Sequence, residues 1–184
     1  MIIFDLDGTL ADCNHRKHLV MRPRGSKFIY DELIPIENGD FLTGNYYEKE
    51  GKKFVPRWQE FFEACHLDTV ISPTRCLFDF IGMKGQSHSL QIWSGRCESV
   101  MEKTKEWLRK YSFAYAFHEF QIPLKMRPLG DYTPDDQLKE RWLDEAISQG
   151  NKIDFVFDDR PKVVRMWKRR GIFVFNCYQR DEEF

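Results

Sequence analysis

From residue 89 onward the sequence alternates between short apolar runs and amphipathic stretches, and this alternation is the strongest constraint on the fold. The apolar runs are typical of buried strands and lie at residues 89–93, 113–124, 153–157 and 172–175. Helical patterns separate them, at residues 98–111, 133–147 and 161–170. Strands that alternate with helices form a parallel sheet with helices on both faces. We therefore expect an α/β fold with a Rossmann-like parallel sheet, to which the apolar residues 1–4 add one strand.

The segment 11–88 does not continue this alternation. Turn-like sequences dominate its first part, while residues 46–55 indicate a hairpin and residues 57–66 and 72–83 indicate two helices. We interpret residues 1–10 and 89–184 as the core of a single domain. Residues 11–88 are then a cap or lid segment inserted over one edge of the sheet.

Composition excludes several classes of protein. With 42% hydrophobic and 31% charged residues and a net charge of −1, the chain is neither disordered nor polybasic. Its five cysteines form no CxxC pair, which argues against a disulfide framework or zinc site and favours a reducing, cytoplasmic location. The chain begins directly with an apolar strand pattern, without a signal peptide, and no apolar run approaches 18 residues, so we expect no membrane span.

Polar side chains follow the predicted strands where ligands bind in open parallel sheets, beyond the carboxyl ends. These positions hold Asp5, Asp7, Thr9, Ser94, Gly95, Arg96, Arg127, Asp135, Lys139, Asp158 and Asp159. Carboxylates held close together need a cation, and hard oxygen ligands suit Mg²⁺. A lysine, a hydroxyl and loop N–H groups suit a phosphoryl group, to which a carboxylate can act as a nucleophile. The set therefore indicates phosphoryl transfer.

At these residues the chain resembles the haloacid dehalogenase (HAD) superfamily. Its four motifs occur in order, as Asp5-x-Asp7-Gly8-Thr9, Ser94, Lys139 and Asp158-Asp159. More narrowly, residues 1–10 and 89–184 resemble the 3′-phosphatase domain of phage polynucleotide kinase, through Trp93-Ser94-Gly95-Arg96, the stretch 127–140 and the stretch 158–167. The span between Leu10 and Ser94 is longer than that domain suggests. No GxxxxGK(S/T) sequence occurs, so we do not expect kinase activity from these residues.

The resemblance implies a HAD fold and Mg²⁺-dependent hydrolysis of phosphate monoesters through an aspartyl-phosphate. It implies that Asp5 is the nucleophile, Asp7 the acid and base, and that Ser94 and Lys139 bind the phosphoryl group. Phosphate or substrate contacts are implied for Thr9, Gly95, Arg96, Arg127 and Asp135. Metal binding is implied for Asp5, Asp7 through its backbone, and Asp158 or Asp159. The implied substrates are 3′-phosphates of nucleic acid ends or nucleotides.

Other functions remain open at this stage. A nucleotidase acting on free 5′-nucleoside monophosphates would use the same chemistry, with the insertion as a lid. A phosphoacceptor signalling domain uses similar residues, but its acidic pair comes in a different chain order. A binding module without catalytic activity is less favoured, because all of the polar residues of the four motifs are present. Oligomeric state is not predicted.

The insertion carries groups that suit a nucleic acid. Its basic stretch contains Arg22, Arg24 and Lys27, which could follow a phosphate backbone or form a solvated loop. Its aromatic residues could stack on bases, although packing within the insertion is the simpler interpretation for most of them.

Overall fold

The computed structural model describes residues 1–29, 33–35, 41–43, 46–84, 89–111 and 122–177. The chain forms two compact units. The core unit comprises residues 1–13 and 65–184, and the insertion unit comprises residues 14–64. Each unit is described by itself below.

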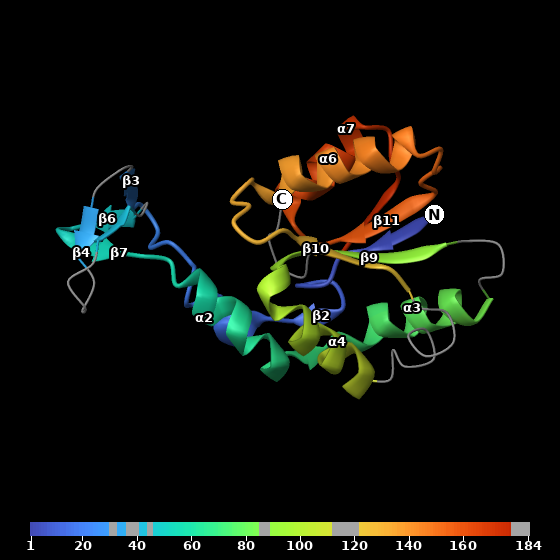
Figure 1. Cartoon of the computed structure of the whole chain (residues 1–184), viewed down its shortest axis with the longest axis horizontal. Coiled ribbons are helices and arrows are strands. Elements are labelled where there is room, and N and C mark those ends of the chain that lie inside the picture. Colours follow the sequence, from blue (N-terminus) through green and yellow to red (C-terminus); the bar gives the residue numbers. More distant parts are fainter. Residues whose placement is uncertain (30–32, 36–40, 44–45, 85–88, 112–121, 178–184) are drawn as a thin grey trace, which may run out of the picture. The chain divides into compact units, whose positions relative to one another are not determined.

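Five parallel strands form the central sheet of the core unit, in the order β10-β9-β1-β11-β12 (Figure 1). Their bounds are β1 Ile2–Phe4, β9 Leu90–Cys97, β10 Leu124–Arg127, β11 Phe155–Asp158 and β12 Val174–Asn176. This sheet confirms the predicted α/β class and its Rossmann-like arrangement. The strand expected at 113–124 falls largely outside the described residues, and the observed strand begins at its last position.

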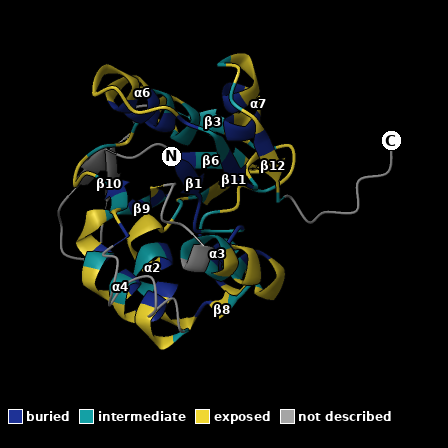
Figure 2. Cartoon of the chain, turned by 90° about the vertical axis from the view of Figure 1, so that its right-hand side faces the viewer, coloured by how far each residue is buried: buried dark blue, intermediate teal, exposed yellow. Residues whose placement is uncertain are grey.

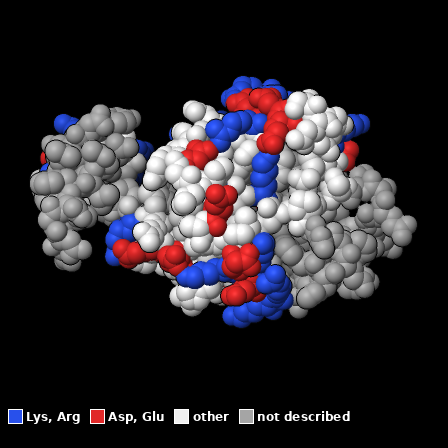
Figure 3. Space-filling view, viewed as in Figure 1, with Lys and Arg blue, Asp and Glu red and all other residues white. Residues whose placement is uncertain are grey.

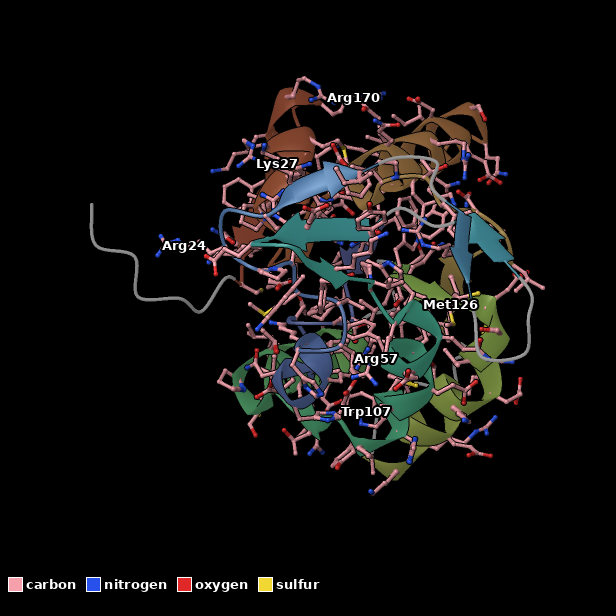
Figure 4. All side chains as sticks on the ribbon, turned by 90° about the vertical axis from the view of Figure 1, so that its left-hand side faces the viewer. Arg24, Lys27, Arg57, Trp107, Met126 and Arg170 are labelled. Atoms are coloured by element: carbon pink, nitrogen blue, oxygen red, sulfur yellow. The ribbon has the colours of Figure 1, made fainter. Side chains whose placement is uncertain are left out.

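Helices cover both faces of this sheet (Figure 1). The longer ones are α3 Ser72–Lys84, α4 Met101–Lys110, α6 Asp135–Ser148 and α7 Pro161–Arg169. Figure 4 labels Trp107 of α4 and Arg170, which directly follows α7. Shorter elements are the 3₁₀ turns Ala64–Leu67 and Glu98–Val100 and the antiparallel pair β2 Ala11–Asp12 and β8 Thr69–Val70.

The alternation of side chains along β1 divides the interior into two cores. Ile3 packs with the tryptophans of the sheet, α6 and α7, which are Trp93, Trp142 and Trp167. Phe4 faces the other way, into a cluster with residues of α3 and α4. Figure 2 shows the buried strands between these two helical layers. A strand buried on both faces explains why residues 1–4 are continuously apolar.

The insertion is shorter in the structure than the segment 11–88 expected from sequence. Strand β8 and helix α3 belong to the core unit. The reason is hydrophobic packing, since Phe78 of α3 is fully buried and its ring lies 5.0 Å from that of Phe4. Truncating a buried phenylalanine typically costs about 3–5 kcal/mol, so α3 contributes to the core itself.

Small antiparallel sheets form most of the insertion unit. Its elements are α1 Asn14–Lys17, β3 Lys27–Ile29, β4 Leu33–Pro35, β5 Phe41–Thr43, β6 Tyr46–Lys49, β7 Lys52–Phe54 and α2 Trp58–Glu63. Strands β3, β6 and β7 form one sheet, and β4 pairs with β5. The antiparallel pair β6 and β7 confirms the hairpin predicted at 46–55.

Two further expectations concern the chain as a whole. All five cysteines are free thiols in the structure. Among the described residues, no helix has both the length and the apolar character needed to cross a bilayer.

Candidate active site

Three neighbouring strands, β9, β1 and β11, bring the predicted polar residues to one edge of the sheet. Asp5 directly follows β1, and Asp158 is the last residue of β11. The backbone N–H of Asp5 donates to the carbonyl of Phe157, at 2.9 Å, which continues the sheet pairing to the site. Strand β9 extends beyond the expected end at residue 93 to Cys97, so Ser94 lies within the strand. Its side chain is fully buried.

The ammonium of Lys139 links the ends of two strands. It donates to Asp5 Oδ1 at 2.7 Å and to Asp158 Oδ2 at 2.8 Å, and the lysine is 3% exposed. Burial alone would lower the pKa of Lys139, but the carboxylates of Asp158 and Asp5 outweigh burial and raise that pKa above its usual value. Lys139 is therefore a fixed cation at the site, and we do not expect it to act as a base.

Three carboxylates gather beside this lysine. One oxygen from each of Asp5, Asp158 and Asp159 lies within 4.8 Å of the others. Burial raises the pKa of Asp5 well above its usual range; Lys139 opposes this shift, and the charges of Asp158 and Asp159 add to it. Burial, together with the charges of Asp159, Asp158 and Asp5, raises the pKa of the Cys177 thiol to about 12. Three carboxylate oxygens this close together form an all-oxygen donor set, which fits Mg²⁺.

The loop after β1 is shaped to meet these carboxylates. Gly8 has a φ of 88°, and a Cβ placed on it would lie 2.0 Å from Asp159 Oδ2. No side chain fits at this point, so the glycine lets the loop backbone approach Asp159 closely. Thr9 is fully buried, and its carbonyl accepts a hydrogen bond from Thr74 Oγ1 of α3, which ties the loop to that helix.

Asp7 contacts a buried arginine. Arg96 is fully buried, and its Nε and one terminal nitrogen donate to Asp7 Oδ1 at 2.9 and 2.5 Å. The same terminal nitrogen donates to Asp68 Oδ2 at 2.6 Å, and the other donates to Thr104 Oγ1 at 3.3 Å. Asp68 is itself fully buried, and its carbonyl accepts a hydrogen bond from the Trp107 indole at 2.7 Å. Sequence reasoning missed Asp68, which belongs to no motif.

An irregularity in β9 directs the Arg96 side chain. The register between β9 and β10 pairs Met126 with Ser94 but Arg127 with Cys97, so Gly95 and Arg96 are bulged. A bulge re-aims a side chain and often occurs beside active sites. Within it, the backbone N–H of Arg96 donates to Ser94 Oγ at 3.2 Å.

Arg127, Asp135 and Arg160 form a chain of ion pairs on the open side of the site. Asp135 accepts a hydrogen bond from Arg127 and forms an ion pair with Arg160. Burial lowers the pKa of Arg160, and the negative charges of Asp5 and Asp7 oppose this shift. A Cβ on Gly95 would lie 2.9 Å from Asp135 Oδ1, so this glycine allows the bulge to pack against Asp135. Arg160 belongs to the stretch 158–167 that carries the family resemblance, but it is not among the predicted site residues.

A tryptophan supports the end of β11. Trp167 of α7 is fully buried, and its indole N–H lies 3.3 Å from Asp158 Oδ2. The backbone N–H of Arg160 donates to the other oxygen of Asp158 at 3.1 Å. Together with Lys139, these contacts leave Asp158 with little rotational freedom. The structure thus brings the predicted residues together near the carboxyl ends of the central strands, and Asp68, Arg160 and Trp167 contact members of this set.

Comparison with known proteins places the chain in a family of phosphatase domains. Residues 57–182 match the family described as the Polynucleotide kinase PNKP phosphatase domain, HAD_PNKP. A putative bifunctional polynucleotide kinase/RNA ligase of Autographa californica nuclear polyhedrosis virus is 31% identical over 185 residues. That alignment covers 88% of this chain and 25% of the relative, so this chain spans about a quarter of its length.

Similar solved structures agree on the fold. Two chains, titled as the Pnkp1/Rnl/Hen1 RNA repair complex and the Pnkp1/Rnl/Hen1 complex, each superpose with a TM-score of 0.62 at 23% identity. Each match covers 96% of this chain. It covers 41% of the first solved chain and 45% of the second. At this level of identity, the likeness concerns the fold.

Proposed function

Because the chain belongs to the family of the polynucleotide kinase PNKP phosphatase domain, we propose that it is a Mg²⁺-dependent phosphatase that removes 3′-phosphates from nucleic acid ends or nucleotides. The observation that carries this proposal is the position of Lys139 between Asp5 and Asp158, with Asp159 beside them. This arrangement supplies a buried carboxylate, a fixed cation and an oxygen-rich metal site at one point.

The first step is attack of an Asp5 carboxylate oxygen on phosphorus. The new O–P bond forms while the bond from phosphorus to the ester oxygen breaks, and the leaving alkoxide takes a proton from Asp7. Lys139 and the Ser94 hydroxyl neutralise and bind the phosphoryl oxygens. The product of this step is an aspartyl-phosphate with the alcohol released.

The second step is hydrolysis of that intermediate. Asp7, now deprotonated, takes a proton from water, whose oxygen attacks phosphorus and displaces Asp5. Inorganic phosphate leaves and Asp7 is again protonated. Arg96 holds the Asp7 carboxyl group in both steps, because its two hydrogen bonds reach Oδ1 from a fully buried position.

The metal would be held by Asp5, the backbone of Asp7 and one or both of Asp158 and Asp159. It would supply positive charge to the phosphoryl oxygens and offset the carboxylates. Burial and the charges of Asp158 and Asp159 raise the pKa of Asp5, and a bound cation would oppose this shift.

The substrate class rests on the relatives. The viral relative is named a polynucleotide kinase/RNA ligase, and the structural neighbours come from RNA repair complexes. Both names favour nucleic acid ends, and RNA as well as DNA. A reducing, cytoplasmic location would suit this role and the free thiols.

A substrate comparison tests the proposal. Release of phosphate is measured from 3′-phosphorylated DNA, 3′-phosphorylated RNA, 3′-nucleoside monophosphates and 5′-nucleoside monophosphates, with Mg²⁺ and with EDTA. We expect a 3′-phosphorylated oligonucleotide to be the best substrate and chelation to stop turnover. Rapid hydrolysis of 5′-nucleoside monophosphates beside an inert oligonucleotide would replace this proposal by a nucleotidase.

Two variants test the chemistry. Asp5→Asn removes the attacking carboxylate, and we expect no turnover. Asp7→Asn removes the proton donor, and because acid–base catalysis typically contributes about 10²–10⁴-fold, we expect only a trace of activity. Normal activity of either variant would refute the assigned roles.

A further inference from the structure

Tyr132 is the most exposed of the large hydrophobic side chains in the described part of the chain. It is 91% exposed and lies in the loop between β10 and α6, at residues 128–134. Figure 1 shows this loop at the carboxyl end of the sheet, the end at which Asp5 and Asp158 lie. A single exposed aromatic side chain is common and means little alone. What distinguishes Tyr132 is the backbone that carries it.

That backbone is fixed on both sides of the ring. The guanidinium of Arg127 donates to the carbonyl of Asp131 at 3.1 Å and to that of Thr133 at 2.6 Å. The backbone N–H of Thr133 donates to Asp131 Oδ1 at 2.8 Å. The hydrogen bonds from Thr133 to Asp131, together with Arg141, hold the pKa of Asp131 well below its usual range, so these bonds persist at neutral pH. The ring is exposed, but its attachment point is held rigidly.

The same arginine connects the loop to the site. Arg127 donates to the carbonyl of Gly95, directly after Ser94, and to Asp135. The two carbonyls flanking Tyr132 and the site residues therefore contact one guanidinium group. The Tyr132 attachment point thus lies within about the length of one arginine side chain from the phosphate-binding edge.

We propose that Tyr132 stacks on the base of the 3′-terminal nucleotide while its phosphate lies at Asp5. This inference rests on the proposed function. A flat ring on a rigid support loses little conformational freedom when it stacks, and stacking tolerates every base.

The charge distribution supports recognition through such a contact. On the face shown in Figure 3, the described basic and acidic side chains lie next to one another. Such a mixture provides no broad positive field to hold a phosphate backbone on that face. An exposed aromatic ring offers a contact that does not depend on such a field.

The experiment compares two substrates that differ only in the terminal base. One is an oligonucleotide with a normal 3′-terminal nucleotide and a 3′-phosphate, and the other carries an abasic residue at that position. We expect Tyr132→Ala to raise KM for the normal substrate by about 5- to 150-fold, the affinity typical of one stacked base, with little change in kcat. Tyr132→Phe should behave like the wild type, and the abasic substrate should not distinguish the three proteins.

A matched control is Phe80→Ala on α3, which removes another aromatic ring that is 60% exposed. It should leave KM for both substrates unchanged. Equal effects of Tyr132→Ala on the normal and abasic substrates, or none on either, would overturn the stacking proposal while leaving the phosphatase function intact. If the wild type cleaves neither oligonucleotide but hydrolyses free nucleotides, the proposed function fails, and the stacking proposal fails with it. A Tyr132→Ala defect confined to a protein-bound substrate would instead assign the ring to a protein partner.

Discussion

The guanidinium of Arg96 reaches a single oxygen of Asp7 from a fully buried position, through two hydrogen bonds of 2.9 and 2.5 Å. A buried cation needs more than one partner, and Asp68 supplies the second carboxylate at 2.6 Å. Asp68 thus fixes Arg96, and Arg96 fixes Asp7. In the proposed reaction, Asp7 must move a proton twice in a defined direction, so its orientation matters at both steps.

We predict that Asp68→Asn lowers kcat by about 10- to 100-fold, the usual effect of losing a supporting contact, while KM changes little. The loss should be smaller with p-nitrophenyl phosphate, because its leaving group needs less help from a proton donor. Steady-state kinetics on both substrates measure this difference. Asp79→Asn, which breaks the partly exposed pair with Arg75, is the control and should leave kcat unchanged. Equal losses on both substrates would show that Asp68 has only a structural role.

Lys139 gives a prediction about stability. Lys139→Met leaves the buried carboxylates of Asp5 and Asp158 without their cation, and breaking a buried pair of this kind typically costs about 3–5 kcal/mol. Urea unfolding in EDTA measures the free energy of unfolding. Lys125→Met removes a more exposed lysine paired with Glu145, so its cost should stay below about 1 kcal/mol.

The pH dependence of the same variant has a definite sign. The pKa of Lys139 is raised in the folded state, so its stabilising effect is fully present below the unfolded value, near 10.4, and is lost as pH rises through the folded value. The difference between wild type and Lys139→Met should therefore not shrink between pH 6 and 9, and should shrink only at higher pH, where Lys139 loses its proton. A difference that disappears near neutrality would contradict a charged lysine at this position.

Gly8 allows a test of backbone approach. Gly8→Ala places a Cβ 2.0 Å from Asp159 Oδ2, whereas Gly150→Ala, at a similar positive φ, has nothing within 4 Å. Both substitutions carry the strain of a left-handed backbone, of about 1 kcal/mol or more. We expect only Gly8→Ala to weaken Mg²⁺ binding, measured by the metal-dependent rise in melting temperature. Equal Mg²⁺ responses in both variants would separate Gly8 from the metal site.

The fold and much of the site could be predicted because both follow from strand position. Residues 1–4 are apolar without a break, which indicates a strand buried on both faces, and the polar residue after such a strand in a parallel sheet lies at the ligand-binding edge. Asp5 and Asp158 were found in this way. Lys139 was found through its place at the start of a helix.

Asp68 could not be predicted in the same way. It lies outside any regular element, between two predicted helices, in a segment whose pattern indicated an insertion. Its role depends on a contact with Arg96, which lies 28 positions later in the sequence. It also depends on the bulge in β9, which no local sequence pattern predicts. The boundary of the insertion differs from the expected 11–88 for a related reason. The packing of Phe78 against Phe4, which assigns α3 to the core unit, is a contact between residues far apart in the sequence.

The insertion unit leads to a prediction about salt. The side chains of Arg22, Arg24 and Lys27 are exposed there. Figure 4 labels Arg24, which precedes β3, and Lys27, which begins it. If each contacts one phosphate of a single-stranded substrate, neutralising all three should reduce the slope of log affinity against log salt by about 2, since each contact contributes about 0.7. KM for a 3′-phosphorylated oligonucleotide, measured from 50 to 200 mM salt, gives this slope, and KM for a 3′-mononucleotide should not change. The control neutralises Lys162, Arg165 and Lys168 of α7, which are also exposed but belong to the core unit. An unchanged slope in the first triple variant would identify its basic stretch as a solvated loop, and equal reductions in both would indicate a general effect of net charge.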